Sequence, residues 1–574
     1  MPQDTHITSH ALKVGILLDS SFVPGWVSYL IDQLCACRSI NPVLILLNGE
    51  PRAPFHTGDA PLVLRAWMAV DRWLRRSNTD ALTSRHLNSL RNNCSIVLMP
   101  LVGCRVTSTS QADLEPLKQA DCELLLYVGS AIPNAEVSAC ARLGLWSLYD
   151  HYSPRTRGVP GLFRDMYEGN RCSRYAPQVI EWKQDRRRTV YRPSVITSYL
   201  SLALNQNAAY WEIADVLVER LTETKWLRRE LPPSGFATGE TPQAVPGNIG
   251  VAAFILRWVM RVIHHEFRKR LFREQWAMIV QPNDGVATRR AVQDCRIIRP
   301  PKSGFYADPF LIERNGNDYL FFEDYSFSSR KGIISFCKLD DQGNCGEPTV
   351  VLERNYHLSY PFLFTWREQV YMIPETRDNR SIELYRAQEF PNSWVLEKVL
   401  MSDVFATDTT LLYHEQKWWL FTAGMREHSS PNSSLWLFFA DSPLGPWTPH
   451  PKNPIVSDPT CARPAGALFF ANGDLVRPGQ DCSTDYGHAI HLHRVSVLSE
   501  TEYAETLIER IPADEIRDCI GIHTVNQSAA YWVMDCKFLM CRITIKRLSQ
   551  LFKRPRAKIE TVNSCSWRTA KTAR

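Results

Sequence analysis

Short apolar runs alternate with longer amphipathic stretches over the first 200 residues. Apolar runs stand at "LKVGILL" (12–18), "NPVLILLNG" (41–49), "CSIVLMPLV" (94–102) and "CELLLYVG" (122–129), and a helix is expected from Trp26 to Cys37. Continuous apolar runs are typical of parallel strands buried on both faces. Strands that alternate with helices form open α/β sheets. We therefore predict an open-sheet α/β domain over residues 1–200.

The pattern becomes helical over residues 201–290, which we predict to be a linker. Residues 232–247 are rich in Pro, Gly and Thr, and the stretch 251–272 is strongly periodic. One side of that helix would carry Arg257, Arg261, His264, Arg268 and Lys269, and the other Phe254, Ile255, Val259, Val262, Ile263 and Phe267. A basic amphipathic helix can lie on an anionic membrane surface, or pack on its own protein with a solvated basic face. Both interpretations stay open here.

Residues 291–545 change to short aromatic and β-branched runs separated by turn signals, and one motif recurs five times. It places Asp308 in "YADPFLI", Tyr360 in "LSYPFLF", Asp408 in "FATDTTLLY", Arg463 in "CARPAGALFF" and His523 in "GIHTVNQ", at steps of 52, 48, 55 and 60 residues. A period near 50 residues with about four strands per repeat is typical of a propeller blade. We predict a five-bladed β-propeller, followed by a disordered basic tail at 546–574.

The repeat predicts a shared site, because the innermost strand of every blade lines one central channel. The five repeated positions would then point into one pocket. A second tier is expected at the next strand ends, comprising Glu323, Asp324, Glu375, Arg477, Gln480 and Asp481. Any single one of these residues could instead cap a strand or bond two blades together.

Composition narrows the function classes. The chain has 574 residues, which favours two or three domains, and its net charge of +6 is mild. Its basic clusters contain no nucleic-acid motif, so no nucleic-acid partner is expected. The 16 cysteines are scattered without a CxxC pair or zinc-site spacing, and the N-terminus has no apolar signal core. We expect free thiols, no metal and a cytoplasmic location, at the inner membrane surface if the basic helix binds lipid.

The acidic five-bladed hub resembles the arabinanase/β-xylosidase glycoside hydrolases. That resemblance implies an Asp in the first blade that acts as the base, an Asp in the third blade that tunes the pKa, and a Glu in the fourth blade that acts as the acid. Asp308 and Asp408 match, but the fourth position holds Arg463, and arginine cannot supply the proton that hydrolysis needs. Arginine suits a phosphate leaving group, as in a nucleotide-sugar donor.

These residues lead to a prediction of glycosyl transfer at the hub. The predicted catalytic residues are Asp308, Asp408 and Arg463. The predicted substrate-binding residues are Tyr360, Glu375, Arg477, Gln480, Asp481 and His523. The substrate would be a sugar nucleotide or a glycan.

A closer resemblance covers roughly residues 296–540. The runs "ADPFL", "YLFFEDY", "KWWLFTA", "ADSPLGPWTPHPKNPI" and "RPGQDCS" are similar to the propeller domain that precedes the transferase domain of plant glucosamine inositolphosphorylceramide transferases. This resemblance implies a role in surface-polysaccharide or glycolipid assembly. The separate transferase domain of the plant enzymes is not found in this chain, so the propeller would be either catalytic or a glycan-binding module.

Residues 12–200 resemble the formyltransferase-type domain that precedes this propeller in bacterial proteins. The stretches that match are "VGILLDSSFVPGW" and "GLWSLYDHYSPRTRGVPGLF". The family's Asn-x-His pair is absent, which leaves Asp150, His151 and Arg157 as candidates. The resemblance implies an alternative function, N-formylation of an amino sugar from 10-formyltetrahydrofolate, with the propeller binding substrate. A third possibility is a non-catalytic glycan-binding scaffold.

Overall fold

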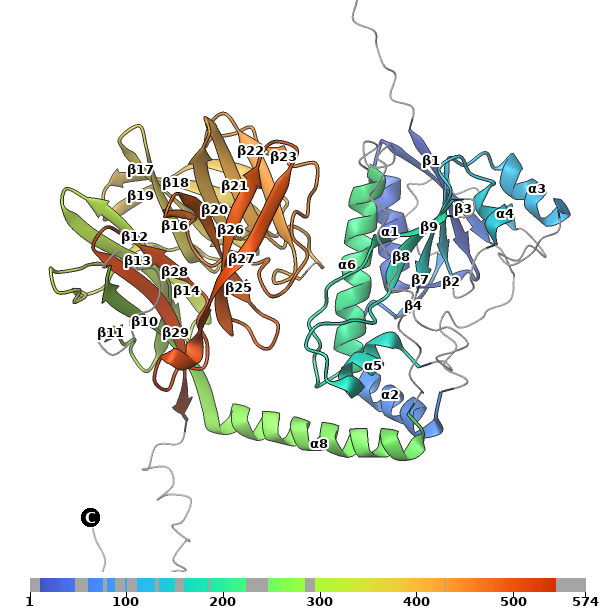
Figure 1. Cartoon of the computed structure of the whole chain (residues 1–574), viewed down its shortest axis with the longest axis horizontal. Coiled ribbons are helices and arrows are strands. Elements are labelled where there is room, and N and C mark those ends of the chain that lie inside the picture. Colours follow the sequence, from blue (N-terminus) through green and yellow to red (C-terminus); the bar gives the residue numbers. More distant parts are fainter. Residues whose placement is uncertain are drawn as a thin grey trace, which may run out of the picture.

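A computed structural model describes residues 11–46, 60–75, 80–87, 99–100, 111–129, 134–149, 159–183, 186–222, 246–283, 295–428 and 430–542. The chain forms an N-terminal α/β domain and a C-terminal β-propeller, joined by the long helix α8 (Asn248–Leu271) along one edge of the molecule (Figure 1). The predicted basic tail lies outside the described residues.

The N-terminal domain is built on a seven-stranded mixed sheet in the order β5-β3-β1-β6-β7-β8-β9. The strands β1 (Leu12–Leu18), β3 (Ile40–Leu46), β5 (Met99–Pro100), β6 (Leu124–Val128) and β7 (Leu145–Tyr149) are parallel. The last two, β8 (Gln178–Lys183) and β9 (Arg186–Tyr191), pair antiparallel. The place of β1 between β3 and β6 explains why all its residues but Lys13 are buried, and the predicted open α/β sheet is confirmed.

Helices cover both faces of this sheet and close its lower end. On one face, α1 (Gly25–Ala36) and α6 (Leu202–Thr222) pack against the sheet and bury one apolar cluster. On the opposite face, α3 (Gln111–Gln119) and α4 (Ala135–Ser138) bury a second cluster. Below, α2 (Leu62–Leu74), α5 (Gly161–Glu168) and the first half of α8 share a third cluster. A short ribbon pairs β2 (Phe22–Pro24) with β4 (Ser84–His86). The helix α6, predicted within the linker, is therefore part of the N-terminal domain.

The propeller has five four-stranded blades, as the repeat predicted. The first four blades are consecutive in sequence: β12 (Gly304–Arg314), β13 (Asn317–Ser326), β14 (Lys331–Lys338) and β15 (Thr349–Leu352); β16 (Ser359–Trp366), β17 (Gln369–Thr376), β18 (Ser381–Glu389) and β19 (Ser393–Ser402); β20 (Thr407–His414), β21 (Lys417–Ala423), β22 (Leu435–Ala440) and β23 (Thr448–Pro449); and β24 (Phe469–Ala471), β25 (Asp474–Asp481), β26 (Ala489–Leu498) and β27 (Tyr503–Pro512).

The fifth blade closes the ring with strands from both ends of the domain. Its order is β11-β10-β29-β28, in which β10 (Phe272–Pro282) and β11 (Arg296–Ile298) come first in sequence and β28 (Val525–Gln527) and β29 (Tyr531–Cys541) come last. All eleven residues of β10 pair with β29. The propeller thus begins at Phe272, and the predicted boundary at residue 291 is too late by one strand.

A further expectation concerns the cysteines. Cys337 and Cys345 form a disulfide in the first blade, so the prediction of free thiols is wrong for this pair. Among the described residues, no helix is both long and apolar enough to cross a bilayer.

Candidate functional site

The first three blades carry the same backbone distortion at the channel end of their innermost strand. A bulge interrupts the pairing between Ala307 and Phe310 in the first blade, and corresponding bulges occur in the second and third. The residues inside the bulges are Asp308, Tyr360 and Asp408, whose φ angles are 52°, 44° and 52°. Residues other than glycine adopt this left-handed backbone conformation at an energetic cost, and such strained residues are frequent at functional sites. We call Asp308, Tyr360, Asp408, Arg463 and His523 the hub residues.

One half of the hub is a chain of two carboxylates and an imidazole. His523 Nδ1 lies 2.6 Å from Asp535 Oδ2, and His523 Nε2 lies 3.3 Å from Asp308 Oδ1. The Thr524 hydroxyl donates to Asp308 Oδ1 over 2.7 Å, and the backbone N–H of Tyr360 donates to Asp308 Oδ2 over 3.2 Å. The ring of His523 packs against Trp276 of β10 at 4.1 Å. The imidazole is therefore fixed between two acids and cannot rotate freely.

The other half of the hub is centred on a buried ion pair. Arg463 Nε donates to Asp408 Oδ2 over 2.6 Å, and Gln480 Nε2 donates to the same oxygen over 3.0 Å. Arg463 Nη1 donates to Asn432 Oδ1 over 3.1 Å, and its guanidinium lies over the ring of Tyr486. The side chains of Arg463 and Glu375 are 12% and 11% exposed and lie 3.9 Å apart. Both groups thus keep a small solvent-accessible surface, unlike Asp308 and Asp408, which are 4% and 2% exposed.

Burial sets the protonation of the hub acids. It raises the pKa of Asp308 to about 6, although the charge on His523 opposes the shift. Burial also raises the pKa of Glu375 well above its usual range, and the carboxylate of Asp408 adds to this. Burial lowers the pKa of His523, but Asp535 and Asp308 outweigh it, so the net shift is upward. The hub thus combines an acid that ionises near neutrality with one that keeps its proton to higher pH.

The structure brings together the five hub residues, Glu375 and Gln480, but it directs three other predicted residues elsewhere. Arg477 donates two hydrogen bonds to Glu505 and is fully buried. Asp481 accepts from Ser483, and Asp324 accepts from Ser335. The remaining predicted residue, Glu323, is buried with one oxygen 3.5 Å from His357 Nε2, and burial together with the charges of Asp308 and Glu375 raises its pKa well above its usual range. Side chains alternate across a strand, so neighbouring strand-end residues cannot all face the channel.

Tyr360 belongs to the hub as a fixed part of its framework. Its hydroxyl lies 2.9 Å from Thr410 Oγ1 and accepts from the backbone N–H of Gly466 over 2.8 Å. With no exposed surface, it ties the second, third and fourth blades together around the channel.

Sequence reasoning missed Asp535, the residue that holds His523. Asp535 accepts from the backbone N–H groups of Asp308, His523 and Thr524 at 2.8 to 3.1 Å. It lies inside the apolar strand β29, and a lone acid at a buried strand position was the available signal. Tyr486, Asn432 and Trp276 were missed because they reach the hub from loops or from the closing strand.

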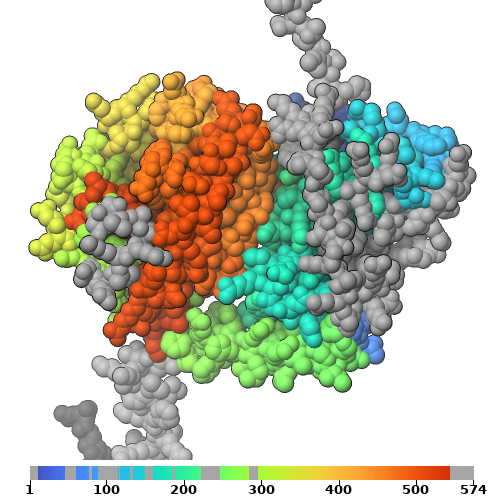
Figure 2. Space-filling model, viewed as in Figure 1, coloured from blue at the N-terminus to red at the C-terminus, as the bar shows by residue number. Residues whose placement is uncertain are grey.

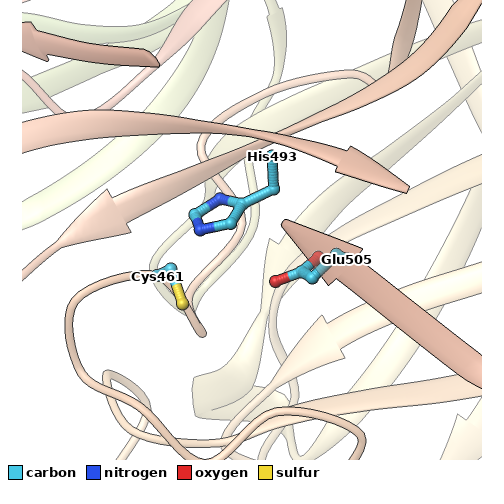
Figure 3. A group of neighbouring side chains, drawn as sticks. All are labelled: Cys461, His493 and Glu505. Atoms are coloured by element: carbon cyan, nitrogen blue, oxygen red, sulfur yellow. The ribbon is translucent and has the colours of Figure 1, made fainter. Parts of the chain in front are cut away.

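A second group of titratable side chains, Cys461, His493 and Glu505, lies outside the hub (Figure 3). Their ligand atoms lie within 4.8 Å of one another. However, both oxygens of Glu505 accept from Arg477. Burial raises the pKa of the Cys461 thiol to about 12, which disfavours a thiolate ligand. A guanidinium on the carboxylate does not fit a bound cation, and we assign no metal here.

The alternative formyltransferase residues Asp150, His151 and Arg157 all lie outside the described residues. The preceding strand β7 is in the mixed sheet, where Ser147 Oγ accepts from Trp182 Nε1 over 2.7 Å. The formyltransferase likeness of this domain stays a prediction.

The fold and site define a five-bladed propeller whose channel end carries an acid–imidazole–acid chain beside an arginine–carboxylate pair. Residues 286–520 match the protein-family model described as "Glucosamine inositolphosphorylceramide transferase 1, N-terminal". Proteins of that name from rice (Oryza sativa subsp. japonica) and Arabidopsis thaliana are 41% and 40% identical over 207 residues, which is 35% of this chain. The match covers 28% and 27% of the two relatives, so the chain spans less than a third of their length.

Solved structures that match include glycoside hydrolases. A thermostable family-43 glycoside hydrolase is 14% identical with a TM-score of 0.28, and covers 36% of this chain and 76% of its own. Zg3597, a family 117 glycoside hydrolase produced by Zobellia galactanivorans, is 11% identical with a TM-score of 0.31, covering 48% and 92%. These likenesses are too distant to carry an argument about chemistry.

Proposed function

We propose that the chain is a transferase of surface-polysaccharide or glycolipid assembly and that sugar transfer occurs at the propeller hub. The observation that carries this proposal is the presence in one hub of two carboxyl groups with raised pKa values, Asp308 and Glu375, the second of which lies 3.9 Å from Arg463. Pairs of acids whose environments set different protonation states are typical of acid–base sites. The sugar-transferase names of the relatives agree with this chemistry.

The proposed step moves a sugar from a phosphate to a hydroxyl. Asp308 takes the proton of the acceptor hydroxyl while the oxygen of that hydroxyl bonds to the anomeric carbon of the donor sugar. The bond from that carbon to the donor phosphate breaks, and its electron pair leaves on the phosphate oxygen. Arg463 stabilises the developing charge, and Glu375 can donate its proton to the same oxygen. His523, held by Asp535, orients Asp308.

The names of the plant relatives suggest which substrates to try first. These names contain both glucosamine and inositolphosphorylceramide, and the latter is a phosphate-bearing lipid. We therefore propose a nucleotide-linked amino sugar as donor and a lipid-linked acceptor for this chain.

One observation favours glycan binding without turnover as a second candidate. Asp408 is engaged by Arg463 and Gln480, so the charge of the arginine is already neutralised in the protein. A hub in which this pair stayed closed would bind sugar through Glu375 and aromatic rings but would not stabilise a leaving phosphate.

Transfer assays on the full chain test the proposal. Radiolabelled UDP-glucosamine and UDP-N-acetylglucosamine would be incubated with vesicles that contain inositolphosphorylceramide, and thermal shift would report donor binding. The variants are Asp308→Asn and Glu375→Gln, with Asp324→Asn as the matched control, because Asp324 faces Ser335 and not the channel. We expect transfer to be lost in the first two and kept in the control. Donor binding with no transfer by the native chain would favour the scaffold, and no binding at all would overturn both.

A further inference from the structure

The helix α8 has two apolar faces, not one. Its buried residues Val251, Phe254 and Trp258 pack into the cluster beneath the N-terminal sheet. On the opposite side lies a second apolar stripe, which we call the outer stripe: Leu256, Met260, Ile263 and Phe267, exposed by 66%, 61%, 58% and 61%. Steps of four, three and four residues place these four side chains on one face of a helix.

This outer stripe differs from an ordinary helix surface. A surface helix of a soluble domain presents polar residues on the side away from the core. Single exposed apolar residues are normal, but a contiguous apolar patch marks an interaction site. The stripe spans about 16 Å of helix, from the rise of about 1.5 Å per residue. Packing of α8 on its own protein accounts for its buried face but not for this exposed apolar stripe.

Basic side chains border the outer stripe. Arg257, Arg261, His264 and Arg268 follow the stripe residues by one position along the helix, and Lys269 and Arg270 add to the charge near its end. The one acid among residues 251–271 is Glu266. An exposed apolar stripe beside cationic residues is complementary to an anionic bilayer, in which acyl chains lie beneath charged headgroups.

The neighbouring helix α2 repeats this organisation. Leu64 and Trp67 face the shared cluster, where the ring of Trp67 contacts Phe254 at 5.3 Å and Trp258 at 5.6 Å. Its exposed apolar residues are Leu62, Val63, Val70, Trp73 and Leu74, with Arg65 and Arg72 beside them. Trp73 is 72% exposed, and tryptophan is favoured at membrane–water interfaces.

We propose that the outer stripe of α8 and the adjoining exposed face of α2 dock the protein on an anionic lipid bilayer. The two helices lie together at the same end of the molecule (Figures 1 and 2). Among the described helices none can cross a bilayer, so α8 would lie in the interface plane. Docking rests on these helices alone and not on the proposed hub reaction.

The helix α8 continues directly into a strand that contacts the hub. The strand β10 begins immediately after Leu271, and Trp276 on that strand packs against His523. Five residues of extended chain span about 17 Å, at roughly 3.3 Å per residue. If the acceptor is a lipid, as proposed above, docking would bring its headgroup close to the channel end of the propeller.

Vesicle sedimentation of the full chain tests this inference. Vesicles of phosphatidylcholine alone would be compared with vesicles of phosphatidylcholine mixed with phosphatidylglycerol. We expect binding to the anionic vesicles. Ile263→Glu/Phe267→Glu should weaken it about tenfold or more, because two apolar anchors are lost. Arg257→Gln/Arg268→Gln should weaken it about fivefold per arginine, and on the anionic vesicles only. Trp73→Glu tests α2 separately.

Matched controls lie on the propeller. Leu396→Glu and Leu507→Glu change residues of comparable exposure, and Arg494→Gln removes an exposed arginine. All three should bind vesicles like the native chain, and every variant should unfold at the native temperature because the changed residues are exposed. Asp308→Asn should also bind vesicles normally, so failure of the hub reaction and failure of docking are told apart.

Two outcomes would overturn the inference. In one, the native chain does not bind anionic vesicles, or all the α8 and α2 variants bind them as tightly as the native chain does. The other is a dimer, measured by light scattering, that Ile263→Glu/Phe267→Glu dissociates while vesicle binding is absent. That result would make the face an interface between two copies of the chain.

Discussion

Asp308 is the residue whose ionisation the proposed reaction requires. Burial raises the pKa of its carboxyl to about 6, so below that pH the base would carry a proton and could not accept another. We expect the rate of sugar transfer to fall as the pH drops through about 6. A pH–rate profile of the native chain measures this. An acid limb near the ordinary aspartate pKa, about 4, would show that Asp308 is not the base.

Arg477 illustrates a residue that serves the fold and not the channel. It pairs with Glu505 at 2.6 Å, and both side chains are almost fully buried. Removing one partner of a buried pair leaves the other charge without compensation, at a cost of about 3–5 kcal/mol. We expect Arg477→Met to lower the free energy of unfolding by that amount in denaturant titrations. Donor binding should be unchanged at temperatures where the variant stays folded.

The control for this variant is Arg494→Met on the next strand, whose ion pair with Asp474 is half-exposed. It should cost about 1 kcal/mol or less. If Arg477→Met were as stable as native and bound donor more weakly, Arg477 would belong to the site after all.

The hub residues could be predicted because the repeat marks equivalent positions in all five units. The next tier could be predicted only in part, since a strand sends alternate residues to opposite sides. On β25, Gln480 reaches Asp408, whereas its neighbour Asp481 bonds to Ser483 and Arg477 bonds to Glu505. Asp535 escaped prediction because its partners lie far away in sequence. Its bond to Asp308 crosses 227 positions.

At the scale of elements, the strand β10 determines whether the propeller can exist alone. It lies between β29 and β11, and its residues Ala277 and Ile279 belong to the core of the closing blade. A fragment of residues 291–545 lacks this strand and leaves the long edge of β29 unpaired, which favours aggregation. We expect that fragment not to unfold cooperatively, whereas residues 268–545 should. Thermal unfolding followed by near-ultraviolet circular dichroism compares them.

Equal cooperativity of the two fragments would show that β10 is dispensable.

The sequence did not place β10 in the propeller because its pairing partner lies more than two hundred residues away. The five repeated motifs mark innermost strands, and β10 is not an innermost strand.

The helix α8 shows where an apolar pattern misleads at the same scale. Its extent was predicted to within a few residues, and its apolar residues were assigned to a single side. The structure divides them: Phe254 is buried, whereas Ile263 and Phe267 lie on the opposite, exposed face. Periodicity alone does not show how many faces a helix uses, because this depends on which neighbours the fold brings to it.

At the scale of the whole molecule, one loop of the propeller connects the hub to the N-terminal domain. In the segment between β21 and β22, Asn432 accepts from Arg463 of the hub, and the next residue, Ser433, donates to Glu212 of α6 over 3.3 Å. The ring of His428, from the same segment, stacks on Trp211 at 4.2 Å. The space-filling view shows the two domains in contact along this side (Figure 2).

Glu212 makes this contact dependent on pH. Burial raises the pKa of its carboxyl to about 7, although hydrogen bonds from Tyr191 and Ser433 oppose the shift. A carboxyl whose pKa is raised on folding contributes stability that is full below its ordinary pKa, about 4.5, and is lost as the pH rises through about 7. We therefore expect the two domains to separate more readily above neutral pH. Small-angle X-ray scattering should record a larger radius of gyration there.

The variant Glu212→Gln isolates the cause of this separation. Glutamine keeps the shape and stays neutral, so its radius of gyration should not change with pH, while the native chain expands as the pH passes through about 7. Glu181→Gln, on β8 and paired with Arg188, is the control and should behave like the native chain. Since Asn432, which accepts from Arg463, lies in the same loop as this contact, the affinity for a donor sugar should fall over the same pH range in the native chain and not in Glu212→Gln. Expansion without any change in affinity would mean that the loop holds the domains together but does not position the hub arginine.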